Sequence, residues 1–358
     1  MRPAALAPAP RPRPGAAGRR GTLPAVPTAP AAVASSWPIT FDDVLAARDR
    51  LRPHLPPTPL RSYALLDEAV GHDIRVWVKH ENHNPTGAFK ARNALALVTA
   101  LSSEERRRGL VAATRGNHGA GLAWAGSLLG APVTVCVPRG NNPDKNAAMR
   151  GFGATLVEEG RDYDEAVLVA QRLVAERGLT LAHSTNDARV IAGAATLTLE
   201  MLEERPEIEA LVFAVGGGSQ AVGGMTVARA RRPDVAVYAV QARGASASHD
   251  GWHARRPVAL DAADTFADGL ATRSTYELTF PALLQGLRGF VTVPDAAIAE
   301  AMRLLLATTH NLVEGAGAAG LAGLLALREE LRGRTVGIVL SGGNVDEATL
   351  RRVLAREV

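Results

Sequence analysis

Short apolar segments alternate with longer amphipathic segments from residue 39 almost to the end of the chain. The apolar segments predict strands at 74–80, 110–114, 132–138, 154–158, 179–183, 210–215, 235–241 and 335–340. Helical periodicity between them predicts helices that include 89–101, 119–129, 164–177, 190–204 and 295–311. Most of these strands are apolar throughout, which is typical of parallel strands covered on both faces. The pattern predicts an α/β fold with open, mostly parallel sheets flanked by helices, and ligands at the carboxyl ends of the strands.

The first 38 residues do not follow this pattern. They contain nine prolines and consist mainly of alanine, proline and arginine. Such a segment cannot bury a core, so we expect a disordered extension at 1–38. It lacks the apolar segment of a signal peptide, although its arginines leave a targeting role open. No run of about 18 apolar residues occurs, so we expect no contact with a membrane interior.

Charge and composition exclude further classes. The formal net charge is +4, but residues 1–40 hold five arginines and no acid. The rest of the chain is therefore close to neutral, and we expect no nucleic-acid partner. The single cysteine, Cys136, excludes an intrachain disulfide and a cysteine-cluster zinc site. We interpret it as a small buried apolar residue in a cytoplasmic protein.

Lysine is rare, because only Lys79, Lys90 and Lys145 occur among the 40 basic residues. Lys90 follows the turn Asn-Pro-Thr-Gly-Ala-Phe and begins a predicted helix. The helix dipole and burial both lower the pKa of such a lysine, and a neutral amine can attack a carbonyl. An ordinary surface lysine is the alternative. Lys79 lies in a predicted strand, whereas the polar neighbours of Lys145 indicate solvated surface.

Two other junctions between a strand and a helix have the composition of ligand-binding loops. Residues 114–119, Thr-Arg-Gly-Asn-His-Gly, offer backbone N–H groups to a carboxylate and the Asn117 amide to a hydroxyl. A histidine such as His118 in this loop is more often a capping or packing residue than a base. Residues 216–220, Gly-Gly-Gly-Ser-Gln, allow close approach of an anion such as phosphate, although a tight turn also explains the glycines.

Two further motifs lie near the C-terminus. Residues 315–320 match the Gly-x-Gly-x-x-Gly pattern of dinucleotide-binding proteins, but the preceding segment is helical and the expected acidic residue is missing. We therefore reject NAD as a ligand and interpret the glycines as packing at a helix start. Ser341 follows the strand at 335–340 and is suited to contact a ligand or to cap a helix.

The four loops together fit one ligand, because the lysine suits an aldehyde, the glycines a phosphate, and Asn117 and Ser341 an aromatic ring. Pyridoxal phosphate carries these three parts. The motif order Asn-Pro-Thr-Gly-x-Phe-Lys, Gly-Asn-His-Gly, triple glycine and Ser-Gly-Gly-Asn resembles the serine/threonine dehydratase family of pyridoxal-phosphate enzymes. This family has the tryptophan synthase β-like fold (fold type II). The resemblance covers about residues 40–358.

The resemblance implies a role for each motif residue. Lys90 would be the catalytic residue and would bind the cofactor through a Schiff base. The other cofactor contacts would be Phe89, Asn117, Gly216, Gly217, Gly218, Ser219 and Ser341. The substrate carboxylate would bind at Thr114, Arg115, Gly116, Asn117 and His118. The resemblance also implies a large cofactor-binding domain at 39–110 and 190–358, a small mobile domain at 111–189, and a homodimer.

The implied reaction is removal of water from a 3-hydroxy amino acid such as L-threonine or L-serine, giving a 2-oxo acid and ammonia. One alternative is β-replacement, as in cysteine synthase or threonine synthase, although their usual Gly-Asn-Thr-Gly and Gly-Thr-Gly-Gly loops are missing here. Another is a non-catalytic small-ligand binder on the same fold, against which the intact Lys90 argues.

The sequence departs from the family pattern at three places. Arg115 stands where racemases of the family carry a serine, and an arginine cannot donate a proton at neutral pH, so we do not expect racemisation. Arg115 is instead suited to an acidic or bulky substrate group, or to a salt bridge at the cleft rim. Gln241 replaces a common glutamate ligand, so we expect no metal. The sequence ends soon after Asn344, which leaves no room for the C-terminal regulatory domain of biosynthetic threonine deaminases. We therefore expect no feedback control by isoleucine.

Overall fold

The computed structural model describes residues 37–161 and 163–358, so almost all of the extension predicted at 1–38 lies outside the described residues. The α-helices of the described chain are α1 (Phe41–Leu51), α2 (Ala64–Val70), α3 (Lys90–Thr99), α4 (Ser103–Arg108), α5 (Asn117–Leu129), α6 (Pro143–Gly151), α7 (Tyr163–Arg177), α8 (Ala188–Glu204), α9 (Ser219–Arg231), α10 (Ala247–Ala254), α11 (Phe280–Gly286), α12 (Asp295–Thr309), α13 (Gly315–Ala326) and α14 (Glu347–Leu354). Short 3-10 helices are η1 (Glu81–His83), η2 (Arg243–Ala245) and η3 (Asp268–Leu270). Within this described part, no helix is both long and apolar enough to cross a membrane.

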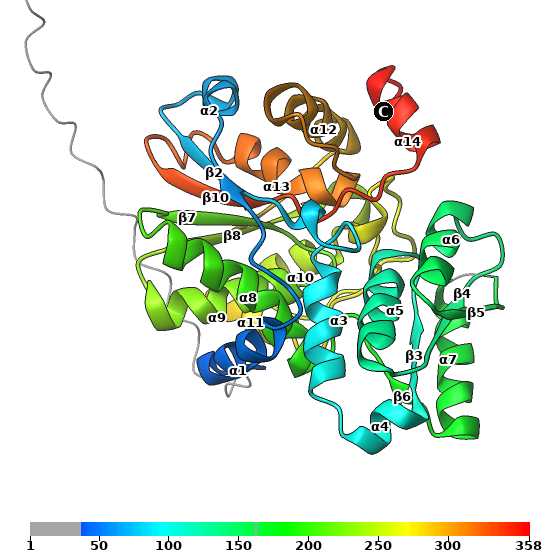
Figure 1. Cartoon of the computed structure of the whole chain (residues 1–358). Helices are drawn as coiled ribbons and strands as arrows, with labels where there is room; N and C mark the ends of the chain where they lie inside the picture. The colour runs from blue at the N-terminus through cyan, green and yellow to red at the C-terminus, as the bar shows by residue number, and fades with distance from the viewer. Residues whose placement is uncertain (1–36, 162) are drawn as a thin grey trace, which may run out of the picture. The chain divides into compact units, whose positions relative to one another are not determined.

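The strands form two sheets (Figure 1). They are β1 (Leu60–Arg61), β2 (Arg75–Lys79), β3 (Leu110–Ala113), β4 (Val133–Val137), β5 (Thr155–Glu158), β6 (Thr180–Leu181), β7 (Ala210–Ala214), β8 (Ala236–Ala242), β9 (Gly289–Val293) and β10 (Thr335–Val339). The six-stranded sheet has the order β1-β2-β10-β7-β8-β9, and the four-stranded sheet has the order β5-β4-β3-β6. Every neighbouring pair is parallel except β1 and β2. The predicted fold class is thus confirmed.

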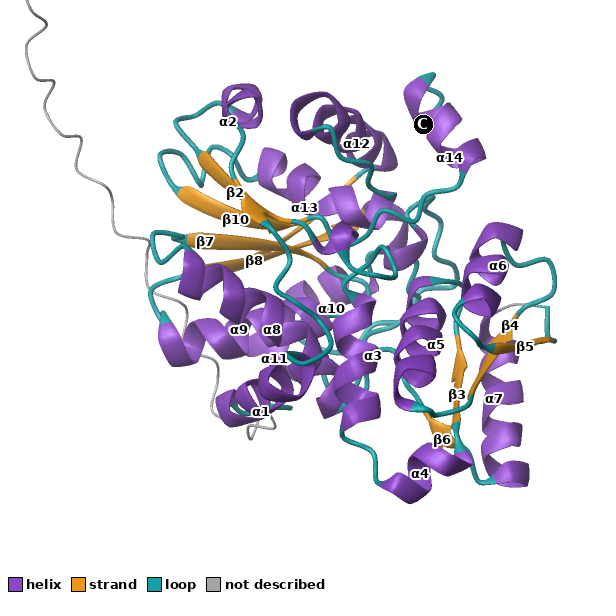
Figure 2. Ribbon diagram, viewed as in Figure 1, coloured by secondary structure: helices purple, strands orange, loops and turns teal. Residues whose placement is uncertain are grey.

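Helices cover both faces of the six-stranded sheet (Figure 2). Val76 and Val78 of β2 face one core with residues of α2, α12 and α13, whereas Trp77 between them faces the other core with residues of α1, α8 and α9. Successive side chains of a strand point to opposite faces, so both sets must be apolar when both faces are covered. This explains why the central strands lack a polar alternation in the sequence.

The strands that the sequence did not predict, β1 and β9, lie at the edges of the six-stranded sheet. β1 is a two-residue antiparallel strand, and β9 at the opposite edge is only partly buried. The strand predicted at 179–183 shortens to the two residues of β6, which is also an edge strand. An edge strand is covered less completely and so needs no continuous apolar run. The helix predicted at 119–129 begins earlier, at Asn117.

Helix α3, whose first residue is Lys90, lies between α5 and α8 (Figure 1). Gly121 of α5 faces the backbone of Lys90, and a Cβ atom at Gly121 would lie 2.7 Å from the Lys90 carbonyl oxygen. Gly193 of α8 faces Arg92 in the same way, at 2.6 Å from its carbonyl oxygen. Glycine at both positions therefore allows two helices to approach the first turn of α3 more closely than any side chain would permit.

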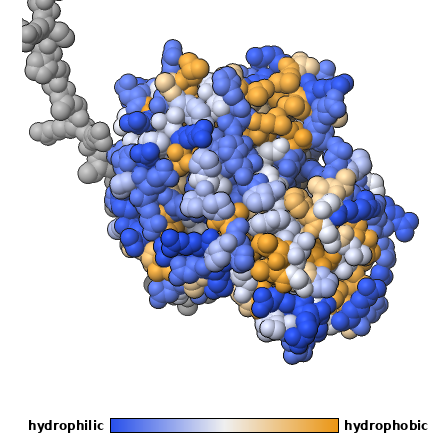
Figure 3. Space-filling model, viewed as in Figure 1, coloured by the Kyte–Doolittle hydropathy of each residue, from blue (hydrophilic) through white to orange (hydrophobic). Residues whose placement is uncertain are grey.

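Hydrophilic residues cover most of the face shown in Figure 3, with apolar residues gathered near α12 and near α5. The exposed large apolar side chains of the described residues include Leu128 in α5, Leu312 just after α12, and Leu354 in α14.

Candidate active site

A cavity of about 770 Å³ lies among the loops that follow β3, β7 and β10. All of the site residues named from the sequence line it: Phe89, Lys90, Thr114, Arg115, Gly116, Asn117, His118, Gly216, Gly217, Gly218, Ser219 and Ser341. Segments more than 200 residues apart in the chain thus meet at one place. Their individual roles stay predictions, but their assembly into one cavity is a property of the fold.

Lys90 enters the cavity from the first turn of α3. Its Nζ donates a hydrogen bond to the Ser184 carbonyl oxygen at 3.2 Å and lies 4.8 Å from the centre of the Phe89 ring. Burial lowers the pKa of Lys90 from 10.5, the usual value for a lysine, to about 8. A substantial fraction of this amine is therefore neutral near pH 8 and able to react with a carbonyl.

The loop between β7 and α9 forms an anion cradle. Gly218 has φ +92°, a left-handed conformation that favours glycine, and a side chain at Gly217 would overlap Thr185. No side chain caps the N-terminus of α9, so its first N–H groups are open to a ligand. Gln220 also lines the cavity and is buried, and its Nε2 has no hydrogen-bond partner among the described residues. An anion would satisfy these donors.

The loop after β3 provides a second open helix N-terminus. Gly116 precedes the first residue of α5, no side chain caps that helix, and the Gly116 N–H donates to Thr114 Oγ1 at 3.2 Å. Arg115 is exposed and lines the cavity, and its guanidinium forms no ion pair within residues 37–161 and 163–358. The loop therefore combines free backbone donors with an unpaired cation, a combination suited to a carboxylate.

The His118 side chain is uncharged at neutral pH. Its Nε2 lies 2.9 Å from the Ala182 carbonyl oxygen, and its Nδ1 has no partner among the described residues. Burial, reinforced by the nearby Lys90, lowers the pKa of His118 to about 3. The neutral ring therefore connects the start of α5 to the loop after β6.

Asn117 is held from both sides. Its Nδ2 donates to Glu314 Oε1 at 2.6 Å, and its Oδ1 accepts from Asn344 Nδ2 at 2.8 Å. Burial raises the pKa of Glu314, an effect that Lys145 and the hydrogen bond from Asn117 oppose. Across the cavity wall, Ser341 Oγ donates to the Ala316 carbonyl oxygen at 3.3 Å. Both predicted ring contacts are thus fixed in orientation by neighbouring polar groups.

Sequence reasoning missed several residues of the cavity wall and misjudged one. Thr185 and Glu314 line the cavity but belong to no motif that we singled out, and Gln220 lies at the end of the glycine loop but was not named as a contact. Lys145, predicted on solvated surface, is only 14% exposed and forms an ion pair with Asp268 of η3. The prediction was wrong because the polar residues before Lys145 form the start of α6, where Asn142 Oδ1 accepts from the Asp144 and Lys145 N–H groups.

The structure also shows the surroundings of Cys136, Gly315 and Gln241, which the sequence analysis interpreted. Cys136 is buried, as predicted, and burial raises the pKa of its thiol to about 11. Gly315 begins α13 and follows α12 without a strand between them, and the rejection of NAD stays a prediction. Gln241 is buried and its Oε1 accepts from the His249 N–H at 3.0 Å. The described residues contain no group of three or more His, Cys, Asp or Glu placed for a metal, and the absence of a metal stays a prediction.

These features fit pyridoxal phosphate. The glycines leave the backbone N–H groups of the loop open to close approach by an anion. The Gln220 amide beside the loop has no partner among the described residues and is suited to donate to a phosphate. Lys90 supplies a reactive amine in the same cavity, and Asn117 and Ser341 supply polar contacts for a ring.

The sequence and the fold are similar to those of known proteins. The family described as pyridoxal-phosphate dependent enzyme matches residues 51–342. The L-threonine ammonia-lyase of Thermotoga maritima is 35% identical over 88% of this chain and 78% of its own. The L-threo-3-hydroxyaspartate ammonia-lyase of Saccharomyces cerevisiae is 33% identical over 86% of this chain and 94% of its own. The structure of maize serine racemase matches with a TM-score of 0.83 and 30% identity, covering 89% of this chain and 97% of the racemase.

The family match spans the lysine loop, the Gly-Asn-His-Gly loop and the triple glycine, and it reaches Ser341. The cavity that these segments build is the one that fits the cofactor. The chain therefore belongs to the family of pyridoxal-phosphate dependent enzymes.

Proposed function

We propose that this enzyme is an ammonia-lyase that removes water from a 3-hydroxy amino acid, such as L-threonine or L-serine, and releases a 2-oxo acid and ammonia. The observation that carries the proposal is Lys90, a lysine whose burial brings its pKa to about 8, in the same cavity as two open helix N-termini. Relatives named for threonine and hydroxyaspartate ammonia-lyase activity support it.

The cofactor would be held by Lys90, by the glycine loop with Ser219, and by Asn117 and Ser341. When bound, pyridoxal phosphate supplies an electron-withdrawing ring that stabilises negative charge at the substrate α-carbon. The chain supplies the rest of the chemistry. The N–H groups at the start of α5 bind the substrate carboxylate, and the neutral Lys90 amine accepts the α-proton.

Water exclusion would come from the small domain predicted at 111–189, which contains most of the four-stranded sheet. The ion pair between Lys145 of α6 and Asp268 of η3 connects this segment to the loops of the large domain at the cavity. We propose that the pair favours the closed form, in which proton transfers are shielded from bulk water. A homodimer and a cytoplasmic location stay predictions of the family resemblance.

The test combines cofactor attachment with product analysis. The protein is incubated with pyridoxal phosphate, reduced with borohydride and digested, and the three lysines are compared by mass spectrometry. Attachment at Lys90 alone, with release of 2-oxo acid from L-threonine or L-serine that Lys90→Ala abolishes, is the expected result. Attachment without oxo acid would favour β-replacement, and no attachment would favour the non-catalytic binder.

Arg115 favours a second substrate candidate, a 3-hydroxy amino acid with an acidic side chain. Arg115 lines the cavity and its guanidinium is unpaired within the described residues, and a relative is named for L-threo-3-hydroxyaspartate. A charge-assisted contact is worth about 1.5–3 kcal/mol, so Arg115→Ala should lower kcat/KM for 3-hydroxyaspartate about 10- to 100-fold and leave that for L-threonine nearly unchanged. Equal losses for both substrates would assign Arg115 to the common carboxylate instead.

A further inference from the structure

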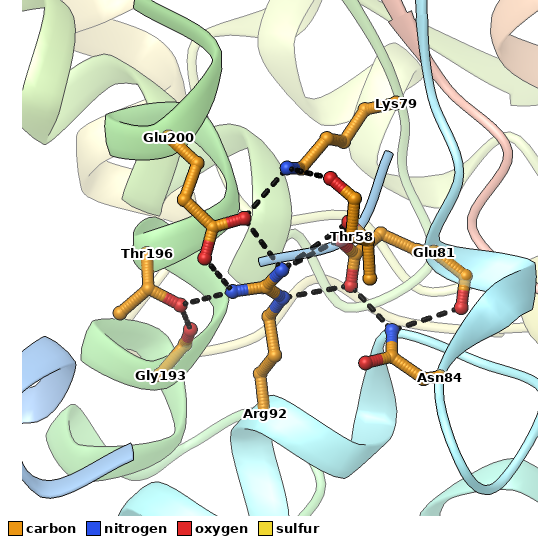
Figure 4. A network of polar contacts seen from close by, with 8 residues as sticks. All are labelled: Thr58, Lys79, Glu81, Asn84, Arg92, Gly193, Thr196 and Glu200. Atoms are coloured by element: carbon orange, nitrogen blue, oxygen red, sulfur yellow. Dashed lines mark hydrogen bonds and ion pairs between the residues drawn. The ribbon is translucent and has the colours of Figure 1, made fainter. Parts of the chain in front are cut away.

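Figure 4 shows a buried polar network that includes Arg92 of α3, the helix that begins at Lys90. Its members are Thr58, Lys79, Glu81, Asn84, Arg92, Gly193, Thr196 and Glu200, and none of them lines the cavity. The network holds two cations and two anions, so its formal charges balance. Glu81 and Lys79 are fully buried, and Arg92 is 2% exposed. The chemistry proposed above uses none of these groups.

Arg92 is the centre of the network. Its Nε and Nη2 donate to the two oxygens of Glu81 at 2.8 and 3.0 Å, and its Nη1 and Nη2 donate to the two oxygens of Glu200 at 2.6 and 2.8 Å. Nη1 also reaches Thr196 Oγ1 at 3.1 Å, and Nη2 reaches Thr58 Oγ1 at 3.3 Å. Every polar edge of the guanidinium therefore has a partner, which fixes its plane as well as its position.

The network holds both ends of the loop that carries Lys90. At its start, Asn84 Nδ2 donates to Glu81 Oε2 at 2.7 Å and to the Glu81 carbonyl oxygen at 2.9 Å. At its end, Arg92 lies two residues after Lys90 on the first turn of α3. Two residues of a helix correspond to about 200° of rotation, so Arg92 and Lys90 point in nearly opposite directions. Arg92 anchors the side of α3 that faces away from the cavity.

Stability alone is a weak reason for such a network. The desolvation of buried ion pairs offsets much of their attraction, and apolar residues of similar volume often stabilise a fold equally well. Here the Arg92 guanidinium overcomes the effect of burial and holds the pKa of the Glu81 carboxyl below its usual range. What a saturated guanidinium provides beyond apolar packing is a defined orientation.

We propose that Arg92 and Glu81 are positioning residues, which fix the loop 84–90 and the first turn of α3 so that the Lys90 amine enters the cavity at the place where the cofactor binds. The proposal rests on the role of Lys90 in the proposed function. It assigns to a network outside the cavity the task of holding the reactive amine in place.

The test measures Lys90 in the full chain before any reaction occurs. Reductive methylation of the cofactor-free protein is followed over a range of pH, and mass spectrometry reports each of the three lysines. In the parent protein, the midpoint for Lys90 should lie near pH 8. Arg92→Lys keeps the charge but loses the planar guanidinium with its several donors, and Glu81→Gln keeps the shape but loses the charge. Both substitutions should move the Lys90 midpoint towards pH 10.5 and weaken pyridoxal-phosphate binding at least tenfold.

Leu66→Ala is the matched control, because Leu66 is fully buried in α2 and its loss should lower the melting temperature without reaching α3. Its Lys90 midpoint and cofactor affinity should stay at the parent values, and Lys145 should be labelled equally in all proteins. If Arg92→Lys and Glu81→Gln do not fold, Thr196→Val removes one acceptor of Arg92 and should shift the midpoint in the same direction. An unchanged Lys90 midpoint in folded network variants would overturn the proposal. A parent protein that does not attach the cofactor at Lys90 would instead overturn the proposed function.

Discussion

Among single residues, Lys90 has the clearest dependence on pH. Its pKa near 8 in the folded chain lies below the usual 10.5, so the unfolded chain binds more protons between these values. The contribution of Lys90 to the free energy of unfolding of the cofactor-free protein should therefore increase as the pH rises from 8 to 10.5. Its reaction with pyridoxal phosphate should speed up about tenfold per pH unit below 8 and then level off.

Stopped-flow absorbance of cofactor attachment checks the second expectation. Lys90→Ala gives the comparison, because any absorbance change that remains in this variant cannot come from Lys90. A rate that keeps rising up to pH 10 would contradict the effect of burial on Lys90.

Gly217 should tolerate no side chain. A methyl group there would overlap Thr185, so Gly217→Ala has to displace either the glycine loop or Thr185. We expect at least a tenfold loss of affinity for pyridoxal phosphate, measured by equilibrium titration, with the melting temperature changed by only a few degrees. Gly151→Ala is the control, because nothing lies within 4 Å of a Cβ atom there. Equal affinities in the two variants would mean that the loop does not hold the phosphate.

Motif residues could be predicted from the sequence, because each stands in an unusual local pattern such as three successive glycines. Thr185 and Glu314 could not, because their roles depend on contacts made across the fold. Glu314 accepts a hydrogen bond from Asn117, which is distant in the chain, and Thr185 faces Gly217 of the glycine loop. No local pattern encodes either relation.

Between elements, the contact of α3 with α5 deserves a direct test. A methyl group at Gly121 would meet the Lys90 carbonyl, whereas one at Gly126 in the same helix would meet Val133 and Ala131, away from α3. Both substitutions should destabilise the fold by about 1–3 kcal/mol in urea unfolding. Only Gly121→Ala should also slow cofactor attachment to Lys90, because only it displaces the helix that carries the lysine. Equal attachment rates in the two variants would show that α3 tolerates the displacement.

Central strands could be predicted and edge strands could not, for one physical reason. β7 and β10 are covered on both faces and on both edges, so all of their residues except Thr335 are apolar. β1 and β9 each have one unpaired edge, and β9 keeps several half-exposed residues. Their sequences therefore include residues suited to solvent as well as residues suited to the sheet.

In the whole molecule, Lys145 and Asp268 connect the segment around the four-stranded sheet to the loops of the larger sheet. Asp268→Asn keeps the shape but removes the ion pair. We expect faster hydrogen exchange in α6, measured by mass spectrometry, and unchanged exchange in the central strands of the six-stranded sheet. KM for the substrate should rise, because the closed form is less favoured. Unchanged exchange in α6 would show that other contacts hold the segment.

The pairing of β2 has a consequence for protein synthesis. Its only parallel neighbour within the described chain is β10, which leaves the ribosome roughly 250 residues later. The strands β3 to β6, in contrast, emerge one after another and are able to pair while the chain is still growing. During translation the lysine loop, which follows β2, is therefore made early but acquires its final support last. A nascent chain interrupted before β10 would carry Lys90 without the strand that joins β2 to the rest of the six-stranded sheet.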